Sequence, residues 1–270
     1  MLTSAQVAEF KAKGYLKSGR VLSDAQVEAM RSELTRVMED RNNPAVPQPV
    51  GISNWNPKAP IWQIVNIWEA SAPYRELLSN PTVVEEVAQL TECKQLRVWH
   101  DQIQFKPATE GGVNMWHQDA PYWPSIGPKN DQVTAWVALD DVDEDNGCMS
   151  MVAGSHAWGN KIDFIHTIKD FYAMPKEFEG HELKVELRPV KKGEVHYHHS
   201  LAWHGSHANK SGRPRRAIAV HYMTQNTVNI GGDHCMKKFM NVPQGAMLEG
   251  AHFPLVWNDG KAIPVAALAG

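Results

Sequence analysis

His117 and Asp119, in the stretch MWHQDAPYW, form the first pair in this sequence with the chemistry of a metal site. They are separated by one residue, and alternate side chains of an extended strand point to the same face, so both groups would converge on one point. Two histidines and one carboxylate on one side of an octahedral ion leave three positions open, as in non-haem Fe(II) oxygenases. The pair therefore predicts a metal centre that needs one further histidine.

A third ligand is available in the histidine-rich stretch from 196 to 216. On an uninterrupted strand from 194 to 204, His196, His198 and His204 would share a face, so spacing leaves the choice among them open. A single His-x-Asp also occurs as a surface pair or as a hydrogen-bonded core pair. The ligand types alone do not separate iron from zinc or manganese. The residues by themselves predict a metal site without identifying its metal.

The elements before this site read mainly as helices. Two Ser/Thr-x-x-Gln patterns, which begin at Thr3 and Ser23, resemble capping boxes that open amphipathic runs. A third helix is predicted to start at Asn80–Pro81, a capping residue followed by proline at the first helical position. The proline-rich segment 41–61 is predicted to be a loop, and its length suggests a lid over a site.

From about residue 95 the sequence consists of short runs rich in Val, Ile, Trp and Tyr, divided by Gly, Pro and Asp. Runs of this kind at regular spacing, without long helices between them, predict an all-β sandwich or barrel behind the helical layer. The predicted strands are LRVWHDQIQF, QVTAWVALDDV, ELKVELRPV, GEVHYHHS and RRAIAVHYM.

The composition excludes some classes of partner. A formal net charge of -3 argues against a dedicated binder of nucleic acid or of an anionic membrane. No stretch is apolar enough to span a membrane, and the start lacks the pattern of a secretory signal. Three widely spaced cysteines fit reduced thiols better than a disulfide framework, which favours a cytoplasmic location. We expect a small-molecule substrate, and the sequence leaves the oligomeric state open.

Three ordered blocks carry a resemblance to a known family. They are WHQDAPYW, TAWVALDDVDEDNGCMSMVAGSHAWG and HHSLAWHGSHANKSGRPRRAIAVHY, which together cover roughly residues 95–225. This pattern resembles the phytanoyl-CoA dioxygenase family. The resemblance implies a mainly β fold with N-terminal helices, a double-stranded β-helix or jelly roll. We expect one domain over residues 1–270, with a helical layer over 1–94, a jelly-roll core over 95–225 and a C-terminal extension over 226–270.

The resemblance also assigns roles at the iron site. It implies that His117, Asp119 and His204 hold Fe(II), with His204 taken as the distal ligand from its HGS context. Arg215, eleven residues after His204, matches the arginine that grips the distal carboxylate of 2-oxoglutarate. A planar guanidinium binds a carboxylate through two parallel hydrogen bonds, which lysine does not reproduce. Its neighbours Arg213 and Arg216 are the rival candidates.

Four further residues match positions near the cosubstrate in family members. Ser206 resembles a hydroxyl that hydrogen-bonds the same carboxylate, and Trp136 an aromatic side chain that flanks it. Gln104 and Gln102 lie on the strand before His-x-Asp, where family members contact cosubstrate or substrate. The alternatives are core packing for the tryptophan and a solvated strand face for the glutamines.

The implied reaction uses Fe(II), 2-oxoglutarate and O2 to hydroxylate an unactivated C–H bond of a small or medium organic substrate, with release of succinate and CO2. The retained Asp119 favours hydroxylation, because a small residue there would open a position for halide. The alternatives are desaturation or cyclisation at the same iron, and a non-catalytic metal- or 2-oxoglutarate-binding protein. A zinc hydrolase is disfavoured because no general base is apparent beside the His-x-Asp pair.

Overall fold

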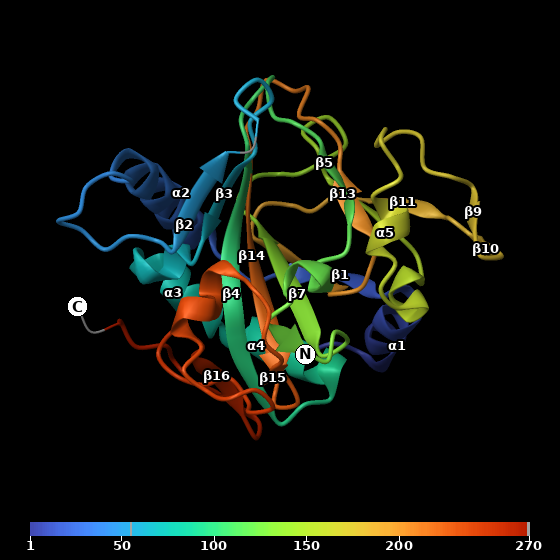
Figure 1. Cartoon of the computed structure of the whole chain (residues 1–270). Helices are drawn as coiled ribbons and strands as arrows, with labels where there is room; N and C mark the ends of the chain where they lie inside the picture. Colours follow the sequence, from blue (N-terminus) through green and yellow to red (C-terminus); the bar gives the residue numbers. More distant parts are fainter. Residues whose placement is uncertain (55, 269–270) are drawn as a thin grey trace.

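The protein is built mainly of antiparallel β-sheet, as Figure 1 shows for the computed structural model, which describes residues 1–54 and 56–268. The largest sheet has nine strands in the order β1-β12-β7-β14-β4-β16-β17, with β3 also paired to β4 and β2 paired to β3. Its strands are β1 (Tyr15–Arg20), β2 (Gly51–Asn54), β3 (Trp62–Val65), β4 (Gln95–Lys106), β7 (Gln132–Ala138), β12 (Glu194–His199), β14 (Arg215–Thr224), β16 (Leu255–Asn258) and β17 (Lys261–Ala262).

A second sheet of four strands lies beside the first, in the order β11-β8-β13-β5 (Figure 1). Its strands are β5 (Asn114–His117), β8 (Met149–Val152), β11 (Val185–Arg188) and β13 (His204–Ser206). Two short pairs complete the β-structure: β6 (Ile126–Gly127) with β15 (Val228–Asn229), and β9 (Glu177–Phe178) with β10 (His181–Glu182). Two curled antiparallel sheets of this kind confirm the predicted jelly roll.

Helices cover the outer face of the large sheet. They are α1 (Ser4–Lys13), α2 (Asp24–Glu39), α3 (Ala72–Leu78) and α4 (Pro81–Thr91). A short α5 (Ile162–Ile165) lies near β5 instead, and the described chain also forms the 3₁₀ turns η1 (Ile67–Glu69), η2 (Ala120–Tyr122), η3 (Ser155–Trp158) and η4 (Cys235–Phe239). Both predicted capping boxes form, at Thr3 and Ser23. Asn80 caps α4 as predicted, although α3 was not foreseen. Within the described ranges no helix has the length and apolarity that spanning a bilayer requires.

The N-terminal third is less helical than predicted. It contains β1, β2 and β3 as well as the helices, and the predicted loop 41–61 contains β2. The pairing of β2 with β3, and of β3 with β4, forms a hairpin on the edge of the large sheet. Sheet pairing thus overrode the local turn preference, because β2 satisfies its backbone groups by adding to the edge that β3 forms on β4.

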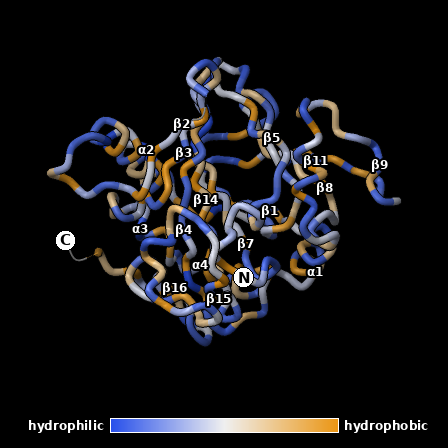
Figure 2. The backbone as a smooth tube through the Cα atoms, viewed as in Figure 1, coloured by the Kyte–Doolittle hydropathy of each residue, from blue (hydrophilic) through white to orange (hydrophobic). Residues whose placement is uncertain are grey.

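The two faces of the large sheet have different roles. On β14, Ile218 and Val220 pack in the core that the sheet shares with the helices, whereas Ala217 and Ala219 pack between the two sheets. Figure 2 shows the corresponding mixture of hydrophobic and hydrophilic residues along the central strands. Small side chains on the inner face leave space between the sheets, and the candidate site occupies it.

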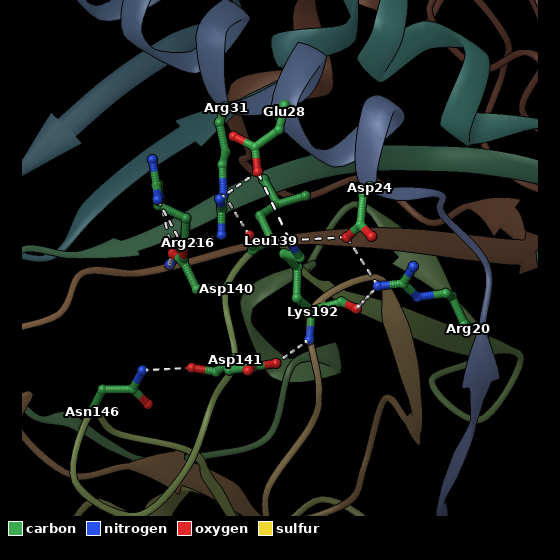
Figure 3. A network of polar contacts seen from close by, with 10 residues as sticks. All are labelled: Arg20, Asp24, Glu28, Arg31, Leu139, Asp140, Asp141, Asn146, Lys192 and Arg216. Atoms are coloured by element: carbon green, nitrogen blue, oxygen red, sulfur yellow. Dashed lines mark hydrogen bonds and ion pairs between the residues drawn. The ribbon is translucent and has the colours of Figure 1, made fainter.

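An acidic turn after β7 anchors the start of β14 (Figure 3). The Asp140 carboxylate accepts hydrogen bonds from Arg216 at 2.7 and 2.9 Å and from Arg31 of α2 at 2.6 Å. Lys192 pairs with Asp24 of α2 at 2.9 Å on the same side. Because Arg216 is held outside the sheet by Asp140, the preceding arginine, Arg215, points into the space between the sheets.

Candidate metal centre and adjoining pocket

Three side chains meet where the two sheets come together. His117 at the end of β5 is paired in register with His204 at the start of β13, and their rings are 4.1 Å apart. Oδ1 of Asp119 lies 3.7 Å from Nε2 of His117 and 3.6 Å from Nε2 of His204. One ligand atom from each residue lies within 4.8 Å of the others, a grouping that could hold a metal ion.

Asp119 does not reach the two histidines from a strand, as the His-x-Asp spacing predicted. Strand β5 ends at His117, and Asp119 has helical backbone angles, φ −72° and ψ −49°, at the start of η2. The pair therefore does not share one face of a strand. The chain turns after His117 and brings the carboxylate back toward the imidazole.

The hydrogen bonds of the two histidines direct their Nε2 atoms to the centre. Nδ1 of His117 lies 2.7 Å from the carbonyl of Met115, and Nδ1 of His204 lies 3.0 Å from that of Ala202. A carbonyl only accepts, so each Nδ1 carries the proton and each Nε2 presents a lone pair. Burial lowers the pKa of both histidines to about 4, which keeps them neutral and able to bind a metal.

Asp119 is oriented by the large sheet. Its Oδ2 accepts hydrogen bonds from Thr134 Oγ1 on β7 and from His198 Nε2 on β12, both at 3.1 Å. Burial alone would raise the pKa of this carboxyl, but the neighbouring His204 and His198 hold it well below its usual range. Oδ1 is thus left for the centre, and the carboxylate is ionised.

The chain does not form one uninterrupted strand from 194 to 204, so the condition under which His196, His198 and His204 would share a face is not met. β12 ends at His199, and after a turn the chain enters β13 in the other sheet. His196 therefore lies away from the centre, where its Nε2 contacts Arg188 at 3.3 Å. His198 hydrogen-bonds Asp119, and His204 alone of the three joins the grouping of possible ligands.

Arg215 is the arginine that faces the pocket. It is 2% exposed, and its guanidinium donates to Ser206 Oγ at 3.2 Å and to the carbonyl of Gln104 at 3.1 Å. The guanidinium carbon lies 5.6 Å from the centre of the Trp136 ring. Its Nε is buried without a partner. Burial lowers the pKa of Arg215 to about 10, so the group remains a cation at neutral pH.

The rival arginines are engaged elsewhere. Arg213 is exposed at a turn and pairs with Asp143 at 2.7 Å, and Arg216 pairs with Asp140. Gln104 and Gln102 line the pocket as expected, and Gln104 Nε2 donates to Gln102 Oε1 at 3.1 Å.

Sequence reasoning missed Lys106, which lies beneath this group of residues. Its side chain is fully buried, and Nζ donates to Ser206 Oγ at 2.7 Å, to the Ser206 carbonyl at 3.0 Å and to the His207 carbonyl at 2.5 Å. It pairs in register with Arg215 across β4 and β14. Burial and the nearby Arg215 lower the pKa of Lys106, while three surrounding oxygens favour its ammonium form. One sequence signal could have identified Lys106: it lies at the end of β4, on the same face as Gln102 and Gln104.

A cavity of about 840 Å³ connects the possible metal ligands with Ser206 and Arg215. Ser53, Asn56 and Ala59, from the segment predicted to act as a lid, line part of it. Sequence reasoning also missed the part played by three histidines from β4, β14 and the C-terminal region. These are His100, His221 and His234, which line the same cavity.

The fold and this site define an oxygenase-type enzyme of the iron- and 2-oxoglutarate-dependent class. Residues 10–217 match the family described as phytanoyl-CoA dioxygenase (PhyH), and the chain belongs to that family. The predicted family and fold are therefore confirmed, and so is the coarser prediction of a 2-oxoglutarate-dependent oxygenase-type enzyme.

Relatives and solved structures extend this comparison. The peroxisomal phytanoyl-CoA dioxygenase of Bos taurus is 26% identical over 246 residues, 84% of this chain and 70% of that protein. A phytanoyl-CoA dioxygenase domain-containing protein 1 of Danio rerio is 33% identical over half of each chain. The non-heme alpha ketoglutarate dependent carbocyclase SnoK is similar in structure, with a TM-score of 0.75, 26% identity and coverage of 94% of this chain and 96% of that one. The epimerase SnoN, crystallised with Fe3+ and alpha ketoglutarate, shares the fold at a TM-score of 0.73 and 22% identity, over 93% of this chain and 97% of that one.

Proposed function

We propose that this protein is an Fe(II)- and 2-oxoglutarate-dependent dioxygenase that hydroxylates an unactivated C–H bond of a small or medium organic molecule, with release of succinate and CO2. His117, Asp119 and His204 hold the iron, and Arg215 with Ser206 binds the distal carboxylate of 2-oxoglutarate. The observation that carries the proposal is a buried arginine without an acid: among the described residues, no carboxylate lies within ion-pair distance of Arg215. A buried cation without a counter-ion is costly unless a ligand supplies one.

The free atoms fit a carboxylate. Arg215 Nε is unpaired, so one edge of the guanidinium can still donate. Ser206 Oγ already accepts from Arg215 and Lys106, which fills both lone pairs and leaves its own proton to be donated. Arg215 and Ser206 lie in the same cavity as the possible metal ligands. One molecule of 2-oxoglutarate would therefore reach the iron with one end and these two donors with its distant carboxylate.

The donor set also fits iron. Two neutral imidazoles and one carboxylate match the facial arrangement that leaves positions open for cosubstrate and oxygen. When bound, iron and 2-oxoglutarate supply the oxidation of the C–H bond by O2. The residues of this chain do the rest: Thr134 and His198 orient Asp119, Arg215 and Ser206 orient the cosubstrate, and Trp136 shields its far end from water.

A second candidate outcome uses the same residues. The structurally similar SnoK and SnoN are named a carbocyclase and an epimerase, so ring closure or epimerisation in place of hydroxylation is the alternative that the comparisons favour. Desaturation and a non-catalytic 2-oxoglutarate- or metal-binding role are the remaining alternatives. Residues 1–270 are proposed to act as one domain. The cytoplasmic location stays a prediction, since the Bos taurus relative is named peroxisomal.

Release of labelled CO2 from carboxyl-labelled 2-oxoglutarate, with succinate measured in parallel, tests the proposal. The purified protein is supplied with Fe(II), O2 and a broad substrate panel, and products are identified by mass. Wild type is expected to release both products, and an Asp119→Ala variant to release neither above background. If no substrate supports release by the wild type, and 2-oxoglutarate does not bind, the proposal is wrong; binding without release would indicate the non-catalytic alternative.

A further inference from the structure

His100, His221 and His234 form a second histidine cluster in the cavity, outside the proposed iron ligands. The rings of His100 and His221 are 4.5 Å apart, and Trp123 packs 4.8 Å from His221. In the part of the chain that the structure describes, only His117, Asp119 and His204 gather closely enough to suggest a metal site. The cluster therefore needs another explanation.

Hydrogen bonding fixes which nitrogen of His221 carries the proton. Its Nδ1 lies 2.8 Å from Thr134 Oγ1, and that oxygen lies 3.1 Å from Asp119 Oδ2. The threonine has one proton, and the carboxylate is the stronger acceptor, so Thr134 donates to Asp119 and accepts from His221. His221 Nδ1 is thus protonated, and its Nε2 presents a lone pair.

His100 leads to the same result by a different contact. Its Nδ1 lies 3.2 Å from the carbonyl of Asp101, which only accepts, so the proton is on Nδ1. Its Nε2 is buried without a hydrogen-bond partner. His100 lines the cavity, and because buried polar atoms are rarely left unpaired, its unpaired acceptor indicates a ligand that donates to it.

The charges along the cavity restrict that ligand. Asp119 and Arg215 are the only Asp, Glu, Lys or Arg side chains among its described lining residues, and the proposed function commits both of them to iron and cosubstrate. Apart from histidines, the described lining of the substrate side therefore has no charged side chain to pair with an ionised substrate or with the phosphates of a CoA thioester.

We propose that the substrate is an uncharged molecule with hydroxyl groups, one of which donates a hydrogen bond to Nε2 of His221 and a second to Nε2 of His100. The inference rests on the proposed function, since it takes this cavity to be the substrate site. His221 then has two roles through its two nitrogens. Nδ1 supports Asp119 through Thr134, and Nε2 selects a substrate by its hydroxyl.

Equilibrium dialysis of small aromatic probes tests the hydroxyl preference without needing turnover. The enzyme is loaded with Fe(II) and saturating 2-oxoglutarate in the absence of O2. The test probe is α-naphthol. Two neutral probes without a hydroxyl group bracket it in size, naphthalene and α-methoxynaphthalene, and α-naphthoate is the anionic probe. We expect α-naphthol to bind about three- to tenfold more tightly than either neutral probe, the gain of one net hydrogen bond, and α-naphthoate to bind most weakly.

An asparagine variant separates the two nitrogens of His221. In His221→Asn the amide N–H can replace Nδ1–H as the donor to Thr134, while the Nε2 acceptor is lost. The preference for α-naphthol is expected to disappear. His166→Asn is the matched control, because His166 lines the same cavity but its Nε2 already pairs with the Tyr122 hydroxyl at 2.9 Å. This variant should keep the preference.

Three results would overturn the inference: equal binding of the neutral probes to wild type, tightest binding of α-naphthoate, or an unchanged preference in folded His221→Asn. The first two are measured on the wild type and do not depend on how a variant folds. They are also distinct from failure of the proposed function, which would appear as absence of 2-oxoglutarate binding and of succinate formation in the separate turnover assay.

Discussion

Replacement of Lys106 by methionine tests whether the buried ammonium orients the cosubstrate pocket. Nζ of Lys106 lies within hydrogen-bond distance of three oxygens, two from Ser206 and one from His207, and the side chain does not line the cavity itself. Methionine has a similar length and no charge. The substitution therefore removes the three hydrogen bonds while it keeps most of the packing volume.

Two effects are expected, one on the stability of the fold and one on the binding of 2-oxoglutarate. Hydrogen bonds from a charged donor contribute about 1.5–3 kcal/mol each, but methionine also avoids the cost of burying an ammonium, which is several kcal/mol. We therefore expect the free energy of unfolding to fall by about 2–4 kcal/mol. Ser206 Oγ loses the donor that directs its proton to the cosubstrate, which should weaken one charge-assisted hydrogen bond by about 1.5–3 kcal/mol and raise KM for 2-oxoglutarate about ten- to hundredfold.

Lys129→Met is the matched control. Nζ of Lys129 also donates to backbone carbonyls, those of Trp123 and Ile126, but Lys129 contacts neither Ser206 nor Arg215. This variant should lose stability and keep the wild-type KM for 2-oxoglutarate. Initial rates of succinate formation and denaturant unfolding are measured for both variants. A Lys106→Met protein that unfolds cooperatively and has the wild-type KM would refute the assigned role of Lys106.

Three other outcomes follow from the structure. Arg215→Lys should raise KM for 2-oxoglutarate by about ten- to hundredfold in the same succinate assay, because an ammonium does not make two parallel hydrogen bonds; a threefold change or less would argue against carboxylate binding there. Thr134→Val removes a hydrogen bond to Asp119 and should weaken iron binding about tenfold or more, measured by metal titration, whereas unchanged affinity would show that this contact is dispensable. Stability should also fall as the pH falls from 6.5 toward 4. Burial lowers the pKa of His199 from 6.5 to about 4 and that of His196 well below 6.5, so the unfolded chain binds more protons in this window. Each such histidine contributes about 1.4 kcal/mol per pH unit to the slope of the unfolding free energy against pH. Unfolding free energies that stay level between about pH 7 and about pH 5 would contradict this.

The sequence predicted what depends on short-range pattern. Strand periodicity from residue 95 indicated the β-fold, and two capping boxes marked helix starts that the structure confirms. The residues His117 and Asp119 could be singled out from their types and spacing, but the geometry expected for them was wrong, because β5 ends between them. The distal histidine could be chosen only by resemblance, since no local feature predicts that the chain changes sheets between His199 and His204.

What the sequence did not predict depends on contacts between distant segments. β2 forms because β3 and β4 provide a sheet edge, although its own residues favour a turn. Lys106 reads as a strand-end lysine bound for solvent, and only the position of β13 against β4 surrounds its Nζ with oxygens. Burial of an ammonium is a property of the assembled sheets, so composition and spacing do not indicate it.

Asp119 connects the two sheets, and this gives the site its most specific structural requirement. Its Oδ1 faces His117 and His204, which belong to the small sheet, while its Oδ2 is held by Thr134 and His198 of the large sheet. Neither sheet alone therefore completes the grouping. A carboxylate shared in this way keeps its orientation only when the sheets pack correctly against each other, so iron affinity should respond to packing between the sheets even where no ligand is changed. The side chains that fill that space contribute to the metal site through the position of Asp119.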